Sequence, residues 1–259
     1  MTSTVLILRT CKADMTAHGG FRWPESGPVE VPDWDPTPEC GHGLHGLLWG
    51  CGDGGTITYP EGRWLVVEAK ADDVVDLGGK VKFPRGTVVY CGTRDEAIAY
   101  LDQHGAADKP VVHATRTGGA YGTATAGDYG TAVAGAGGTA TVGDYGTAVA
   151  RAYGTATAGA YGTATAGYAG TAVAGDDGTA TAGDDGTATA GLRGTATAGY
   201  AGTAVAGDDG TATAGDYGEI RIRWHDGRRY RLAVGYVGED GIRANVAYRV
   251  VDGKLTEAK

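Results

Sequence analysis

Residues 122–217 contain one eight-residue unit repeated twelve times without an insertion, with the consensus Gly-Thr-Ala-(Thr/Val)-Ala-Gly-x-x. A fixed short period is typical of stacked architectures, in which each repeat buries its surface only against its neighbours. Two glycines in every unit oppose a helix, at about 1 kcal/mol per glycine. The segment between them alternates with period two, as strands do. The array therefore predicts ordered β-structure rather than a disordered Gly-rich segment.

Sixteen residues per coil is the period that best explains the array. One octad is too short to close a coil, whereas two octads can face each other as a two-sided β-solenoid. The segment 168–184 recurs as 200–216, at an offset of two such coils. A sixteen-residue coil also places like residues in one corner column, whereas a three-sided coil does not; the column holds Tyr129, Tyr145, Tyr161, Asp177, Arg193 and Asp209. We therefore expect six coils, forming a rod of roughly 25–30 Å.

Either of two alternating faces of the array is a candidate for the interior. Thr-to-Val replacement suits a buried site, and it occurs at Val133, Val149, Val173 and Val205. Alanine, however, fills the third position of all twelve units, as expected where only a methyl group fits. After the array, Ile220 takes the alanine parity and Glu219 the threonine parity, although Arg116 before the array argues the reverse. We favour alanine inside.

With alanine inside, paired threonines two residues apart form outward ranks that face water. Along a strand such pairs lie about 6.6–7 Å apart, and neighbouring strands lie about 4.8 Å apart. The candidate water- or ice-facing residues are Thr123, Thr125, Thr139, Thr141, Thr155, Thr157, Thr163, Thr165, Thr179, Thr181, Thr187, Thr189, Thr195, Thr197, Thr211 and Thr213.

The flanking segments indicate three domains: an α/β head (1–112), the solenoid (113–217) and a C-terminal β cap (218–259). In the head, Thr93 and Glu96 form a capping-box pattern before a helix, and five prolines in 23–38 predict an extended loop. The expected strands of the head are 4–8, 64–69 and 87–90. In the tail, strands at 220–224, 229–234 and 244–251 are expected to form an antiparallel sheet over the last coil. Head and tail would thus close the open ends of the rod.

A Cys/His cluster in the head is the one group of residues that suggests metal chemistry. Cys40, His42, His45 and Cys51 are of the types that bind zinc. Their spacing is not that of a standard finger or ribbon. A nucleophilic Cys/His pair would also need an orienting third group, which the sequence does not place. We therefore expect a locally hydrogen-bonded loop, with no metal, no cofactor and no catalytic residues.

Charge and composition exclude several partners. The net charge of −9 and the lack of a Lys/Arg run predict no nucleic-acid binding and no membrane binding. The first residues lack the pattern of a secretion signal, so the protein is expected to be cytoplasmic or virion-associated, and the four cysteines are expected as free thiols or metal ligands rather than as disulfides. Self-association remains open in two forms, a dimer along the tyrosine column or a trimeric β-roll with a shared core. An unidentified protein partner of the head is also expected.

Two resemblances add to these predictions. The array, with its Thr-Ala-Thr-Ala-Gly rungs and tyrosine corners, resembles the sixteen-residue coils of bacterial ice-nucleation proteins and, more loosely, β-solenoid antifreeze proteins. The whole layout is similar to uncharacterised bacterial and phage-encoded proteins, through 12–15, 40–45 and 75–81. The first resemblance implies a β-solenoid and an ice-binding face; the second implies a phage or prophage setting.

The sequence therefore favours a non-enzymatic structural or interaction protein, a rigid capped scaffold. Ice binding through the outward threonines is the main alternative, and a zinc-binding or enzymatic head is the second.

Overall fold

The computed structural model describes residues 3–258 and divides into two compact units, Met1–Ala114 and Thr115–Lys259. The twelve repeats and the tail belong to the same unit, because strands of the tail pair directly with strands of the array. No helix among the described residues is long and apolar enough to cross a membrane.

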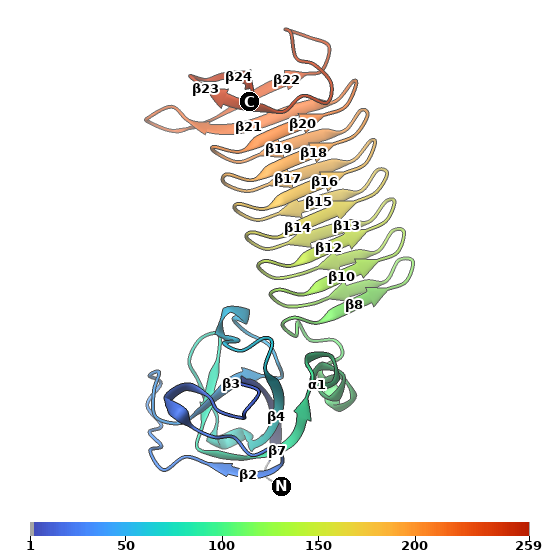
Figure 1. Ribbon diagram of the computed structural model, residues 1–259. Helices are drawn as coiled ribbons and strands as arrows, with labels where there is room; N and C mark the ends of the chain where they lie inside the picture. The colour runs from blue at the N-terminus through green and yellow to red at the C-terminus, as the bar shows by residue number, and fades with distance from the viewer. Residues whose placement is uncertain (1–2, 259) are drawn as a thin grey trace. The chain divides into compact units, whose positions relative to one another are not determined.

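The N-terminal unit is built on one antiparallel sheet of seven strands, in the order β2-β7-β4-β1-β3-β6-β5 (Figure 1). One α-helix and several short turns of 3-10 or π type complete it. The strands are β1 (Thr4–Cys11), β2 (Gly27–Glu30), β3 (Leu44–Leu48), β4 (Arg63–Lys70), β5 (Val75–Asp76), β6 (Val81–Phe83) and β7 (Arg85–Gly92). The helices are α1 (Arg94–Leu101) and the short segments His18–Gly20, Gly54–Thr56, Ala71–Asp73 and Asp102–Ala106.

The strands and the helix predicted for the head are largely confirmed. The three predicted strands correspond to β1, β4 and β7. Helix α1 begins after Thr93, whose backbone N–H and hydroxyl both donate to Glu96 Oε2, at 3.2 and 2.7 Å, so the capping box is formed. The prediction that 23–38 is entirely loop is wrong for Gly27–Glu30, which pairs with β7. β2 is an edge strand, where a proline costs no ladder hydrogen bond, and Pro28 is therefore tolerated.

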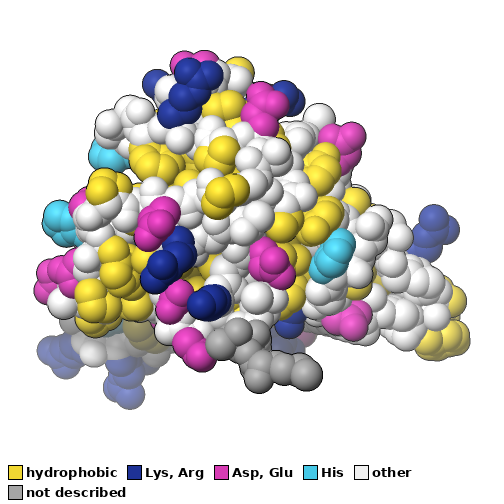
Figure 2. Space-filling view, turned by 90° about the horizontal axis from the view of Figure 1, so that it is seen from below, with side chains coloured by type: hydrophobic (Ala, Val, Ile, Leu, Met, Phe, Trp, Pro, Cys, Tyr) yellow, Lys and Arg dark blue, Asp and Glu magenta, His cyan; other side chains and the backbone are white. Residues whose placement is uncertain are grey.

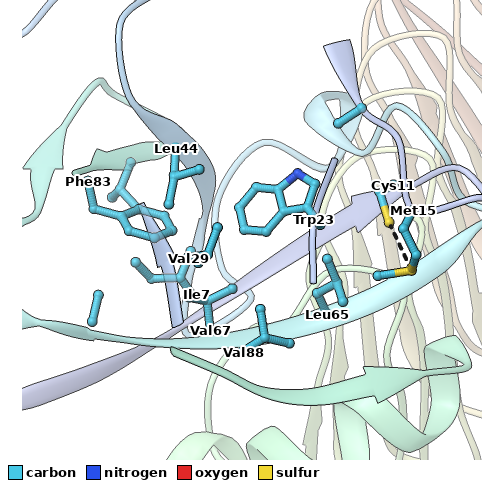
Figure 3. Close-up of a cluster of buried hydrophobic side chains, with 13 residues drawn as sticks. Ile7, Cys11, Met15, Trp23, Val29, Leu44, Leu65, Val67, Phe83 and Val88 are labelled. Carbon is cyan, nitrogen blue, oxygen red and sulfur yellow. Dashed lines mark hydrogen bonds between the residues drawn. The ribbon is translucent and has the colours of Figure 1, made fainter. Parts of the chain in front are cut away.

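Apolar side chains on one face of this sheet form the core shown in Figure 3. Ile7 of β1 and Val67 of β4 are fully buried there, as is Phe83 at the end of β6. Trp23 is brought in from the proline-rich segment and packs edge-on against Phe21, with ring centroids 5.5 Å apart. The proline-rich segment therefore covers the sheet rather than projecting from it.

The C-terminal unit is a two-sided β-solenoid, in which each coil gives one strand to each of two parallel sheets (Figure 1). Sheet 1 contains β8 (Thr115–Gly118), β10 (Thr131–Ala134), β12 (Thr147–Ala150), β14 (Thr163–Ala166), β16 (Thr179–Ala182), β18 (Thr195–Ala198) and β20 (Thr211–Ala214). Sheet 2 contains β9 (Thr123–Thr125), β11 (Thr139–Thr141), β13 (Thr155–Ala158), β15 (Thr171–Ala174), β17 (Thr187–Ala190), β19 (Thr203–Ala206) and β21 (Glu219–His225).

The sixteen-residue period is confirmed by the strand register. Thr163 pairs with Thr179 on sheet 1, and Thr171 pairs with Thr187 on sheet 2. The structure has seven coils rather than the six expected from the repeats alone. β8 before the array and β21 after it follow the same path, although their sequences depart from the consensus.

Alanine forms the interior of the solenoid, as its invariance in the array indicated. Ala164, Ala180 and Ala196 are fully buried in successive strands of sheet 1, and Ala172 and Ala188 face them from sheet 2. The threonines of the same strands are exposed or partly exposed. Arg116, whose parity opposed this arrangement, is aligned with Ala132 in the first coil and is partly buried.

Most corners are tight Gly-x-x-Gly turns, closed by a hydrogen bond from the last glycine N–H to the first glycine carbonyl; at the corner of residues 151–154, Arg151 takes the first position. At one corner Gly186 donates to Gly183 over 3.1 Å. Asp185, before the last glycine, has a φ of +55°, in the left-handed region. A Cβ at Gly186 would lie 2.9 Å from both the Ala182 Cβ and the Gly170 carbonyl oxygen of the preceding coil. Glycine is therefore required by the close stacking of one corner on the next.

The tail extends both sheets of the solenoid. β22 (Tyr230–Tyr236) pairs antiparallel with β21, and β23 (Tyr248–Val251) meets β20 at one bridge and pairs with β24 (Lys254–Glu257). Ile220 and Ile222 are buried in register with interior alanines of β19. The predicted strand 244–251 is too long, because only its last four residues are in strand conformation.

We predict that the third-position alanines of the interior tolerate no larger side chain. Ala180→Val should destabilise the protein by about 1–3 kcal/mol, because the added methyl groups have no space between the sheets. Thr181→Val introduces the same residue on the outer face of the same strand and should change stability by less than about 0.5 kcal/mol. Urea unfolding measures both free energies. Equal values for the two variants would contradict an interior limited to methyl groups.

Candidate functional site

The two outer faces of the solenoid carry the paired threonines in different patterns. On sheet 1, four consecutive strands each present an uninterrupted Thr-x-Thr pair. We call this set the four-strand threonine face; it consists of Thr163, Thr165, Thr179, Thr181, Thr195, Thr197, Thr211 and Thr213. It is the longest unbroken set of such pairs in the array, since valine replaces the second threonine in β10 and β12 of the same sheet.

The other eight candidate threonines lie on sheet 2, on the opposite side of the coil. They are Thr123, Thr125, Thr139, Thr141, Thr155, Thr157, Thr187 and Thr189. Three consecutive strands carry complete pairs, and then Val173 and Val205 interrupt the pattern. The structure thus divides the sequence-predicted residues between two surfaces. Neighbours in sequence alternate between the sheets, so this division becomes visible only once the coil period is known.

Register makes the four-strand threonine face a regular grid. Thr179 pairs directly with Thr163 and Thr195, and Thr181 pairs with Thr165 and Thr197. In a β-sheet, neighbouring strands lie about 4.8 Å apart and alternate residues along a strand about 6.6–7 Å apart. Threonine is stiff at χ1 because it is branched at Cβ, so each methyl and hydroxyl has few positions. The face is therefore a fixed two-dimensional pattern of small apolar and polar groups.

A column of side chains runs along one edge of the solenoid, at the second corner position of successive coils. Tyr129, Tyr145 and Tyr161 stack with ring centroids 5.0 and 4.9 Å apart and planes only 4° from parallel. The next members, Asp177 and Arg193, form a bidentate ion pair with N–O distances of 2.8 and 2.5 Å. Asp209 occupies the same position in the following coil. The column thus fixes the register between coils at the solvent-exposed edge.

Hydrogen bonds from Arg193 lower the pKa of Asp177, and the positive charge of the guanidinium acts in the same direction. The ion pair is exposed at the arginine end. Exposed pairs contribute little to stability, and this one is accordingly a register device more than a source of stability.

Aspartate at the first corner position has a role that the sequence did not reveal. Asp144 Oδ1 accepts a hydrogen bond from the backbone N–H of Ala160, sixteen residues on, at 2.7 Å. The same bond recurs from Asp176 to Leu192 at 2.8 Å and from Asp184 to Tyr200 at 2.9 Å. Each carboxylate thus satisfies a backbone donor of the next coil. The recurrence of Asp in the repeats indicated a structural role, but only the register between coils shows which backbone N–H each carboxylate accepts from.

The Cys/His candidates for a metal site do not converge. His42 Nδ1 lies 3.2 Å from Asp33, Cys40 Sγ accepts from Lys80 Nζ at 3.2 Å, and Cys51 Sγ contacts the Trp49 carbonyl at 3.5 Å. His45 is partly buried on β3. Within residues 3–258, no three His, Cys, Asp or Glu side chains are grouped so that they could hold a metal ion. These four residues are close in sequence, but in the folded protein the side chains of Cys40, His42 and Cys51 each contact a different neighbour.

Comparisons with known proteins assign different relatives to the two parts of the chain. Residues 5–100 match a domain family of unknown function, DUF7666. The chain is 41% identical to an ice nucleation protein of Xanthomonas campestris pv. translucens over 113 residues, which is 42% of this chain and 7% of that protein. It is also 41% identical to ice nucleation protein InaU of Pantoea ananas (39% of this chain, 10% of the relative) and to an ice nucleation protein of Pseudomonas syringae (37% and 9%). No solved structure matches the chain.

These relatives support the resemblance carried by the repeats. The matched lengths are close to the 96 residues of the array, and we attribute the similarity to its coils. The chain spans a tenth or less of the length of these relatives. The protein is therefore a β-solenoid whose array is similar to those of ice nucleation proteins. The comparisons give no support to a phage setting.

We predict that removing the arginine of the column raises the pKa of Asp177. In Arg193→Gln the carboxylate loses its bidentate partner, so its pKa should return towards the ordinary value of about 3.9. A lowered pKa in the folded state stabilises the protein above the unfolded-state pKa, and this contribution is lost as pH falls through the folded-state value. The variant should therefore lose less stability on acidification than the wild type.

An NMR titration of the aspartate carboxyl groups measures this pKa. Arg223→Gln removes the same charge from the tail, where the guanidinium lies 4.4 Å from the Tyr230 ring centroid. This control should leave Asp177 unchanged. An unaltered pKa in Arg193→Gln would show that the ion pair is not formed in solution.

Proposed function

We propose that the protein binds ice through the four-strand threonine face. The observation that carries the proposal is the unbroken grid of Thr-x-Thr pairs on β14, β16, β18 and β20, held in register by the parallel ladder. The similarity of the array to ice nucleation proteins supports it independently. In this proposal the rigid β-solenoid, which the sequence favoured as a scaffold, holds the four-strand threonine face in place.

The chemistry of the face suits an ordered water layer. The hydroxyl groups can hydrogen-bond to water, whereas the methyl groups between them cannot. Water above a methyl group therefore hydrogen-bonds to other water molecules rather than to the protein. The threonine positions of these four strands carry no charge, so no strongly hydrated ion disturbs the pattern. The backbone of every central strand is paired on both sides, so ordering the surface costs little further entropy on binding.

The size of the array favours adsorption to an existing crystal over templating of a new one. The face spans four strands, or about 15 Å from the first to the last at the usual strand spacing. Relatives named as ice nucleation proteins are at least ten times longer than the segment they share with this chain. A small grid orders few water molecules, whereas a face of any size can attach to a lattice that already exists.

We predict that Thr181→Lys abolishes ice binding. The lysine places a flexible, strongly hydrated charge at the centre of the four-strand threonine face. Thr189→Lys introduces the same residue on sheet 2, next to Val173 and Val205, and should retain most of the activity. Thermal hysteresis and ice-recrystallisation assays on the full chain measure the effect, and urea unfolding verifies that both variants are folded.

The two variants also identify the active face. Loss in Thr189→Lys alone would move the site to sheet 2, and equal loss in both would contradict a single binding face. No hysteresis and no inhibition of recrystallisation by the wild type at tens of micromolar would refute ice binding. A non-enzymatic scaffold, which the sequence favoured, would then be the better account of the rod.

A further inference from the structure

A cavity of about 400 Å³ opens in the N-terminal unit, where the end of β1 separates from β3. β1 pairs with β3 only through Ile7 and Leu8, and the strand then continues beyond the end of that pairing. Arg9 and Thr10 therefore line the cavity together with His45 of β3 and Lys80 from the turn before β6. The site is independent of the solenoid, because every lining residue belongs to the N-terminal unit.

The charge of this cavity is opposite to that of the chain. The protein has 31 acidic and 22 basic side chains, yet no Asp or Glu is among the described residues that line the cavity. Arg9 and Lys80 both contribute to the lining. The face of the N-terminal unit nearest the viewer in Figure 2 instead mixes acidic and basic side chains. A concave site lined by cations and lacking carboxylates concentrates anions.

Two polar atoms beside the cavity have no partner within the described protein. Arg9 Nε is buried and donates to no acceptor, although the guanidinium lies 5.9 Å from the Trp23 ring centroid. His45 Nε2 is also buried and unpaired, while the ring hydrogen-bonds to the backbone of Gly43. Buried polar groups in folded proteins are nearly always paired, so each such atom calls for an explanation. A ligand bound in the cavity is one explanation that accounts for both unpaired atoms.

His45 provides an acceptor rather than a further charge. Burial lowers the pKa of its imidazole to about 4, and the charges of Lys80 and Arg9 act in the same direction. The ring is therefore neutral near neutral pH. Because a bond to the Gly43 carbonyl uses one ring N–H, Nε2 is left with a lone pair that seeks a donor. The cavity thus offers cationic donors to an oxyanion and one neutral acceptor to a hydroxyl group.

Lys80 and Thr10 have partners that a ligand need not displace. Lys80 Nζ donates to Cys40 Sγ at 3.2 Å, which is a weak acceptor and leaves other ammonium protons available. Thr10 is buried, and its hydroxyl oxygen accepts from the Tyr59 N–H at 3.4 Å, so its own proton can still be donated. The remaining wall includes Leu8, Leu47 and Ile57. This apolar part gives room for carbon atoms beyond the anionic group.

We propose that this cavity binds a small phosphate monoester, with Arg9 and Lys80 holding the phosphate oxygens and His45 Nε2 accepting from a P–OH or a neighbouring hydroxyl group. Arginine and lysine are the usual phosphate-binding side chains, arginine through its planar fork and lysine as a point charge. A carboxylate has only two oxygens and, when ionised, no hydroxyl group. It can therefore accept from Arg9 and Lys80 but cannot also donate to His45 Nε2, as a phosphate with a P–OH group can.

Isothermal titration calorimetry of the full chain near pH 6 tests the assignment with inorganic phosphate, glycerol 3-phosphate and sulfate as probes. Sulfate has the shape of phosphate but carries no proton, so it cannot donate to His45. We expect both phosphates to bind at least about tenfold more tightly than sulfate, the difference made by one good hydrogen bond in a buried site. Tighter binding of glycerol 3-phosphate than of inorganic phosphate would identify an ester as the occupant, and the reverse order would identify the free ion and overturn the ester.

Lys80→Gln should weaken phosphate binding by about tenfold or more, and Lys80→Arg should retain it. Lys254→Gln, which removes the same charge from the exposed end of the tail, should have no effect. Because a folding defect would imitate a loss of binding, the His45 ring signals in the wild-type NMR spectrum give a second measurement, and they should shift on adding phosphate while those of His225 stay fixed. No heat with either phosphate, or equal affinities for phosphate and sulfate, would overturn the proposal.

Discussion

The close approach of two parallel sheets is the constraint on which the solenoid depends. Only a methyl group fits at the third position of the repeat, where alanine is buried in every coil from Ala132 to Ala212, whereas the fifth position also accommodates Val142. Such a core buries little apolar area per residue, and stability must come instead from continuous backbone ladders and dense packing. The corners carry the same constraint, because at Gly186 the preceding coil leaves no room for a Cβ. One spatial limit thus explains both residue types that dominate the repeat.

The proposed ice-binding face follows from what this interior leaves outside. Since alanine occupies the inner parity, threonine must occupy the outer one, and the ladder then holds the hydroxyl and methyl groups of Thr179 and its neighbours in register. The edges are kept in register separately by stacked tyrosines, by the Asp177–Arg193 pair and by carboxylates such as Asp144 that accept from the next coil. Charged groups of the array are thereby concentrated at the corners, and the flat faces remain uncharged.

The N-terminal unit obeys different rules. Its antiparallel sheet has a mixed apolar core, with Trp23 and Phe83 among the large side chains that fill it. Two buried polar atoms in its strands, Arg9 Nε of β1 and His45 Nε2 of β3, have no partner within the described residues. A uniform array offers a repeated surface, whereas an irregular domain can build one enclosed site. The two units therefore differ in the kind of ligand that we propose for each, a crystalline surface for one and a small anion for the other.

The sequence by itself determined the β-solenoid and its sixteen-residue coil, because a strict repeat imposes the same local environment at every turn, and it favoured alanine over threonine for the interior. It also determined the capped helix α1, whose signal is confined to Thr93 and Glu96. Only the tertiary structure decided which parity of the array faces inward, because the sequence alone allowed threonine or alanine there and the close approach of the two sheets selects alanine. It likewise separated Cys40, His42 and Cys51 and placed Arg9 of β1 and His45 of β3 at one cavity, since these positions depend on long-range packing that no local pattern encodes.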